Sequence, residues 1–212
     1  MSKFVLKQYY IVVIFSGFVF GGCESVFFDA KTTARQGIYQ QQIRNSDSTA
    51  RLLGVSDSKK LSLMDPHQAF GVGLDDLRTR RLLSAAKFYG HLYLIMDGTN
   101  CVGFAEAKAN ERRADISNLQ KNPLAAKSLE ALSVVRDIAE RERYEIRYLN
   151  IPSVSFFALW LHSESSDRIL PLTDFAGALR QKQLYSEQDV INGLLEAAAK
   201  AKESEHMYKK PQ

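Results

Sequence analysis

The sequence predicts an α+β domain, in which helices pack on a mainly antiparallel sheet of about five strands, preceded by a signal segment and a polar tether. Three observations lead to this prediction. An apolar run lies next to the N-terminus, strand-length apolar runs fill the middle of the chain, and amphipathic stretches alternate with them. The chain has 212 residues, of which 45% are hydrophobic and 25% charged, as expected for one globular domain. Its net charge of +4 is too small to indicate a nucleic-acid partner.

The N-terminal residues have the pattern of a secretion signal. Lys3 and Lys7 precede the apolar run of residues 9–20, which is too short to span a membrane as a helix. Gly21-Gly22-Cys23 follows directly. This order resembles the cleavage and lipidation box of bacterial lipoproteins, although Phe20 stands where that family usually has leucine.

The resemblance implies a signal peptide over residues 1–22, a diacylglycerol group on Cys23, and a protein anchored by lipid in the bacterial cell envelope, facing the periplasm. Two other readings stay open. Cleavage after Ser25 would release a soluble periplasmic or secreted protein, and retention of the leader would leave residues 4–22 as a short anchor. A buried N-terminal element of a cytosolic protein is the remaining alternative.

Residues 23–60 are polar and predict a tether with one short helix near residues 34–44. The folded domain is expected over residues 61–201, with a disordered tail over 202–212. If Cys23 is lipidated, Cys101 has no internal disulfide partner. Its place inside a strand pattern indicates an inert, partly buried thiol.

The first half of the domain predicts one helix and one hairpin. Asp75 caps the expected helix, which carries apolar residues to Gly90 and is preceded by a flexible entry at residues 71–73. Residues 91–96 and 101–107 form the expected hairpin around an Asp-Gly-Thr-Asn turn.

The second half predicts two helices and three strands. The first helix begins at Asn122-Pro123, a typical cap and first-turn pair, and runs to Arg143. Strands follow at 144–149, at 155–162, which is apolar on both faces, and at 168–172, where a proline indicates a sheet edge. A final helix is capped by Ser186, with Asp189 three residues on.

Few residues have the spacing that catalysis requires. Ser84 and Lys87 have the S-x-x-K spacing of penicillin-binding enzymes, but the companion motifs are missing, so a surface pair on a helix is the preferred interpretation. The paired acids Asp75-Asp76, and Glu164 with Asp167, are adjacent only because they lie at a helix start and in a turn.

The four histidines are His67, His91, His162 and His206, and none has the spacing of a helical metal pair. His91 and His162 border strands and could meet in space with Glu106 or Glu164, but we interpret them as exposed strand ends. Strand aromatics could form an apolar groove, although core packing is the preferred interpretation. These are Tyr93, Phe104, Tyr148, Phe156, Phe157 and Trp160.

These observations lead us to expect a binding or interaction module of the cell envelope, held at the membrane by Cys23, with a possible envelope protein as partner. No catalytic residue, metal ligand or cofactor is assigned. A small secreted hydrolase built from Ser84, Lys87 and His91 or His162 is the alternative from another class. A third hypothesis is an inhibitor or immunity-type protein that blocks one partner with a strand edge such as residues 168–172.

Overall fold

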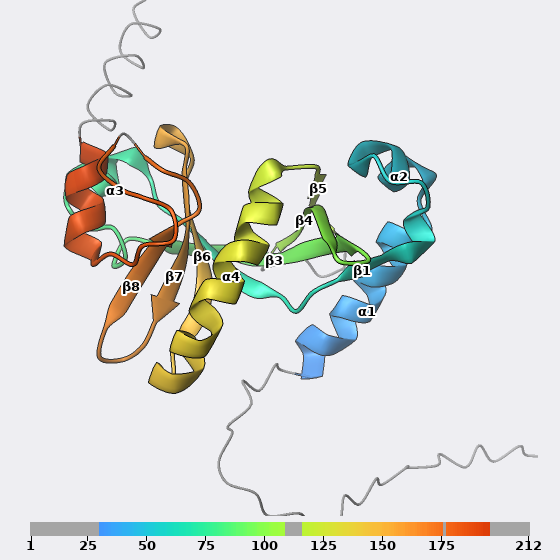
Figure 1. Ribbon diagram of the computed structural model, residues 1–212, viewed down its shortest axis with the longest axis horizontal. Coiled ribbons are helices and arrows are strands. Elements are labelled where there is room, and N and C mark those ends of the chain that lie inside the picture. The colour runs from blue at the N-terminus through green and yellow to red at the C-terminus, as the bar shows by residue number, and fades with distance from the viewer. Residues whose placement is uncertain (1–29, 109–115, 176, 196–212) are drawn as a thin grey trace, which may run out of the picture.

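A computed structural model describes residues 30–108, 116–175 and 177–195 (Figure 1). The predicted leader, Cys23, Ser25, His206 and the C-terminal tail lie outside these residues. The helices are α1 (Ala30–Arg44), α2 (Asp47–Leu53), α3 (Leu74–Arg78), α4 (Pro123–Glu142) and the short 3-10 turns η1 (Ser58–Lys60) and η2 (Pro152–Val154). The strands are β1 (Leu61–Leu63), β2 (His67–Gly71), β3 (Lys87–Asp97), β4 (Asn100–Lys108), β5 (Asn118–Gln120), β6 (Glu145–Ile151), β7 (Phe156–His162) and β8 (Asp167–Pro171).

The strands form one mixed α/β fold with an eight-stranded sheet in the order β5-β4-β3-β2-β6-β7-β8, and β1 pairs with β3 next to β2. The described pairs are antiparallel except β2 with β6, which run parallel. The prediction of five strands is therefore wrong. The missed strands β1, β2 and β5 have only three to five residues, too few for a clear alternation of apolar and polar positions.

The predicted hairpin is confirmed as β3 and β4, which are joined through Gly98 at φ +60°. The helix expected between Asp75 and Gly90 is wrong in extent. It ends at Arg78, Arg80 takes a positive φ of 58°, and β3 has already begun at Lys87. Of the flexible entry predicted at residues 71–73, Gly71 belongs to β2, and only Val72 and Gly73 lie outside regular structure.

The second half follows the prediction closely. The Asn122 side chain accepts a hydrogen bond from the Leu124 amide at the start of α4, as expected for its cap position. Ser186 and Asp189 bond each other's backbone amides, and residues 187–195 are helical. Strand β8 ends the strand order, as its proline indicates.

The sheet is covered by helices on both faces. Along β3, Leu92 and Leu94 belong to the core cluster under α4, whereas Tyr93 and Ile95 face the opposite side and pack with α1 and α2. A third cluster, under α3 and the helix at 187–195, covers β6 and β7 on that same opposite side. The central strand β7 is thus buried on both faces, as predicted.

The stretch expected to be a tether is folded over residues 30–60. Tyr39, Ile43 and Leu53 are buried in the cluster with β1 and β3, with 3%, 1% and 1% of their surface exposed. The Gln40 side chain bonds both Leu61 and Leu63 of β1 through their backbone groups, which closes the free edge of that strand. The short helix expected near residues 34–44 is found as α1, but its packing on the sheet was not predicted, because glutamines lie among its few apolar positions.

Candidate functional site

The S-x-x-K pair does not form a catalytic arrangement. Ser84 lies exposed in a turn and Lys87 lies exposed at the first residue of β3, so they are not one helical turn apart. The physical reason is the early end of α3 at Arg78. Both side chains are exposed, as the surface interpretation predicted, but residues 84–87 are not helical.

His91 and His162 lie on the same sheet face, opposite α4, but not together. Strands β2 and β6 separate β3 from β7, which places the two backbones about 14 Å apart at normal strand spacing. Glu106 pairs with Leu92, so it belongs to the other face. The side chains that the hydrolase hypothesis would combine in one site therefore do not lie together.

The partner of His162 is Asp167, which sequence reasoning had placed in a turn. One carboxylate oxygen of Asp167 accepts from the Trp160 indole N–H at 2.7 Å and lies 2.8 Å from His162 Nδ1. In the β7–β8 hairpin, His162 is paired directly with Asp167. The contact could have been predicted from the sequence if residues 163–166 had been interpreted as the tight turn of a hairpin. The arrangement fixes the imidazole and satisfies the buried indole.

Five rings make successive contacts across the sheet face opposite α4, and we call them the ring row: His91, Phe88, Phe70, Trp160 and His162. Their successive centroid distances are 5.3, 5.6, 5.2 and 5.2 Å. The contacts are edge-on or tilted, the geometry that aromatic pairs prefer. The row crosses the sheet from β3 to β7, and two of its members, Phe70 and Trp160, also belong to the cluster under α3 and the helix at 187–195.

Arg147 of β6 is stacked within the ring row. Its guanidinium carbon lies 5.1 Å from the Phe70 centroid and 4.8 Å from the Trp160 centroid. Its Nε donates to a Glu145 carboxylate oxygen at 2.8 Å, and Nη2 bonds the same oxygen. Since the arginine side chain is only 16% exposed, the rings and carboxylate together hold it in one orientation.

The aromatic groove considered from sequence is mostly core. Tyr93, Phe104, Tyr148 and Phe156 are each 2% exposed or less, and Trp160 is 5% exposed. Phe88, which sequence reasoning placed near the end of a helix, is 41% exposed on β3 instead. The exposed member of the ring row is therefore Phe88, which lies between His91 and Phe70.

Cys101 is a partly buried residue of β4, as predicted. Burial raises the pKa of its thiol to about 11. The thiol is therefore protonated at neutral pH and a poor nucleophile. Among the described residues, no group of three or more histidine, cysteine, aspartate and glutamate side chains could hold a metal ion.

The β8 edge proposed for an inhibitor is partly occupied. The backbone amide and carbonyl of Ile169 bond Tyr185, each at 2.9 Å, and Pro171 has no amide hydrogen. A partner strand would have to displace the segment around Tyr185 before it could pair with β8.

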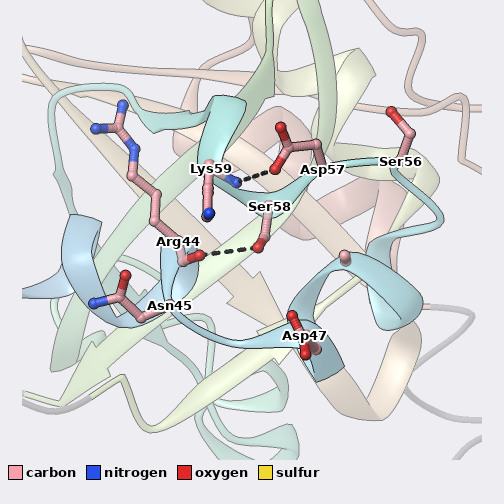
Figure 2. A pocket seen from close by; sticks show the side chains of 8 residues that line it. Arg44, Asn45, Asp47, Ser56, Asp57, Ser58 and Lys59 are labelled. Atoms are coloured by element: carbon pink, nitrogen blue, oxygen red, sulfur yellow. Dashed lines mark hydrogen bonds between the residues drawn. The ribbon is translucent and has the colours of Figure 1, made fainter.

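A polar hollow of about 270 Å³ lies between the end of α1, the start of α2 and η1 (Figure 2). Two of the side chains that line it are used locally, since Asp57 caps the Lys59 amide at 2.9 Å and Ser58 donates to the Arg44 carbonyl at 2.9 Å. Arg44 and Lys59 are balanced there by Asp47 and Asp57. These contacts connect α1, α2 and η1 to each other, so we interpret the hollow as structural and not as a ligand site.

His67 gives the fold a dependence on pH. Burial lowers the pKa of its imidazole below the ordinary 6.5, although a hydrogen bond to the Ile146 carbonyl opposes this in part. The unfolded chain therefore takes up a proton first as the pH falls through 6.5, and the folded state loses stability. We expect the melting temperature to drop from neutral to mildly acidic pH.

His67→Asn should reduce this drop, because asparagine keeps a donor near the position of Nδ1 and does not titrate. Some dependence will remain, since burial also lowers the pKa of His91. Thermal unfolding followed by circular dichroism across this pH range measures both. An equal drop in wild type and variant would contradict the role assigned to His67.

Comparison with known protein families, curated proteins and solved structures finds no match. Among the described residues, none of the helices is long and apolar enough to cross a bilayer. The ring row with Arg147 and Asp167 is the candidate functional site.

Proposed function

We propose that this chain is a cell-envelope protein that is tethered to the membrane through Cys23 and acts by binding a protein partner. The signal-like leader and its Gly-Gly-Cys box support the tether. The ring row supports binding, and its exposed member Phe88 is the single observation that carries this proposal.

The ring row has the properties of a protein-contact surface. Aromatic and arginine side chains contribute much of the energy of protein interfaces, because they offer large areas of contact at low conformational cost. Here the cost is reduced further, since Arg147 is held by Glu145 and Trp160 by Asp167 before any partner arrives. Phe88 contacts the rings of Phe70 and His91 and leaves 41% of its surface exposed.

The hydrolase alternative has weaker support. Its proposed nucleophile Ser84 and base His162 come from separate parts of the fold, at the turn before β3 and at the end of β7. Asp167 orients His162 as it would a general base, but the nearby hydroxyls have other partners. The Ser163 hydroxyl bonds the backbone of Ser166, and the Ser166 hydroxyl lies 2.7 Å from the Tyr144 hydroxyl.

Site-specific photo-crosslinking tests the proposal. A benzophenone side chain placed at Phe88 of the full chain in bacterial cells should give one discrete crosslinked protein, identified by mass spectrometry. The matched control is Val134 on α4, which is also 41% exposed but lies on the opposite face. Equal crosslinking from both positions, or none from Phe88, would count against a partner at the ring row.

A further inference from the structure

We propose that residues 30–63, here called the N-terminal lobe, form a docking surface for anionic phospholipid and hold the domain against the bilayer that anchors it. The lobe contains α1, α2, η1 and β1, which lie together at one end of the molecule (Figure 1). The inference rests on the proposed membrane attachment and adds the surface that meets the lipid.

The first argument is the length of chain between anchor and fold. Only six residues, 24–29, separate Cys23 from the first residue of α1. A fully extended chain spans at most about 3.6 Å per residue, so the start of α1 lies within about 25 Å of the anchored cysteine. The same short distance applies if the leader is retained as the anchor. A tether that continued to residue 60 would have allowed the domain to stand far from the membrane.

The second argument is the distribution of charge. Residues 30–63 contain six basic residues and two acidic ones, a net charge of +4. Residues 64–212 contain twenty basic and twenty acidic residues, and residues 1–29 contain two of each. The excess of basic residues in the folded part of the chain therefore lies in residues 30–63, and Glu24 and Asp29 are the two acidic residues between Cys23 and the lobe. Anionic lipid attracts such a surface once it is within about 10 Å, the screening length of moderate salt.

The third argument is the surface of the lobe itself. Arg51, Lys59 and Lys60 are exposed. Two of the large apolar side chains exposed in the described structure are also here, Ile38 at 47% and Leu52 at 49%. The lobe thus exposes both basic and large aliphatic side chains, and surfaces that lie in the headgroup region typically carry both kinds. The hollow in Figure 2 does not add to the attraction, because its two basic and two acidic side chains balance.

The test uses full-length protein extracted from the membrane fraction and placed in vesicles of phosphatidylethanolamine with or without phosphatidylglycerol. A single fluorophore is attached at Ile38→Cys or at Val134→Cys, with Cys101→Ala in both chains. A quencher carried on lipid headgroups should reduce fluorescence from position 38 much more than from position 134, and phosphatidylglycerol should increase the difference. Equal quenching at the two positions overturns the proposal.

Charge variants separate docking from mere tethering. Each basic side chain near an anionic surface changes the attraction roughly fivefold, so Lys59→Gln with Lys60→Gln should weaken docking roughly 25-fold and lower the quenching at position 38. The matched control is Lys127→Gln with Arg136→Gln, an equal loss of charge on exposed positions of α4. If both double variants behave alike, the lobe is not the docking surface.

Intact mass of the extracted protein shows independently whether Cys23 carries acyl chains or the leader is retained. If the protein is instead recovered soluble and cleaved, the proposed tether fails. The soluble protein is then added to the same vesicles, and the same comparisons are made. Phosphatidylglycerol-dependent quenching at position 38 would still support the lobe as a lipid-docking surface, and no quenching would overturn it.

Discussion

Ile43→Ala is expected to lower the free energy of unfolding by about 2–4 kcal/mol, because it removes a buried side chain and leaves a cavity against the sheet. Ile43 is 1% exposed and belongs to the cluster that joins α1 to β1, β3 and β4. Its neighbours include Tyr39, whose ring meets Tyr93 of β3 edge-on at 5.5 Å. Chemical denaturation of the full chain measures the change.

The control for Ile43 is Ile38→Ala on the same helix. Ile38 is 47% exposed, so the same substitution there should change stability by less than about 0.5 kcal/mol. The pair distinguishes a packed helix from a polar tether, since two isoleucines in a tether would respond alike. Equal small effects would mean that α1 does not belong to the cooperative core.

The elements that the sequence predicted well are those with a strong local signal. The cap at Asn122, the turn around Gly98 and the cap at Ser186 depend on side chains within a few residues of each other, and each is found as expected. Strands β6 and β7 were also long enough for their patterns to be read. Local chemistry determines these elements, so one sequence is sufficient to find them.

The elements that it missed depend on distant contacts. Strand β1 has three residues and is defined by its pairing with β3 and by the Gln40 side chain of α1. Strand β2 is the parallel neighbour of β6, almost eighty residues away in the chain. No local periodicity marks such segments. Helix α1 was predicted as a short helix near residues 34–44, but not as a packed one, because it lacks the apolar stripe that normally identifies a packed helix.

The candidate site was predictable only in part. His162 and Trp160 were recognised as strand residues, and the hairpin register places Asp167 beside them. Arg147, Phe70 and Phe88 come from three other strands, and only the strand order β3-β2-β6-β7 brings them together. Because that order includes the missed strand β2, the ring row could not be inferred from the sequence.

Gly90→Ala is expected to destabilise the fold by about 3 kcal/mol. Gly90 lies in β3 opposite Lys108 of β4, and a Cβ atom there would lie 2.3 Å from the Ala107 carbonyl oxygen and 3.1 Å from the Lys108 Cα. Both obstacles are backbone atoms of a paired strand, so relief requires the strands to separate locally. Overpacking of this kind typically costs 1–3 kcal/mol or more, roughly the magnitude we expect.

The matched control is Gly37→Ala, because the same methyl group there should have the opposite effect. Gly37 is an exposed residue within α1, and a Cβ atom would meet nothing within 4 Å. Alanine favours a helix over glycine by about 1 kcal/mol, so this variant should be more stable than wild type. Urea denaturation of the two variants and wild type compares them directly. If Gly90→Ala were tolerated, β3 and β4 would not approach each other as closely as described, and the placement of His91 in the ring row would need revision.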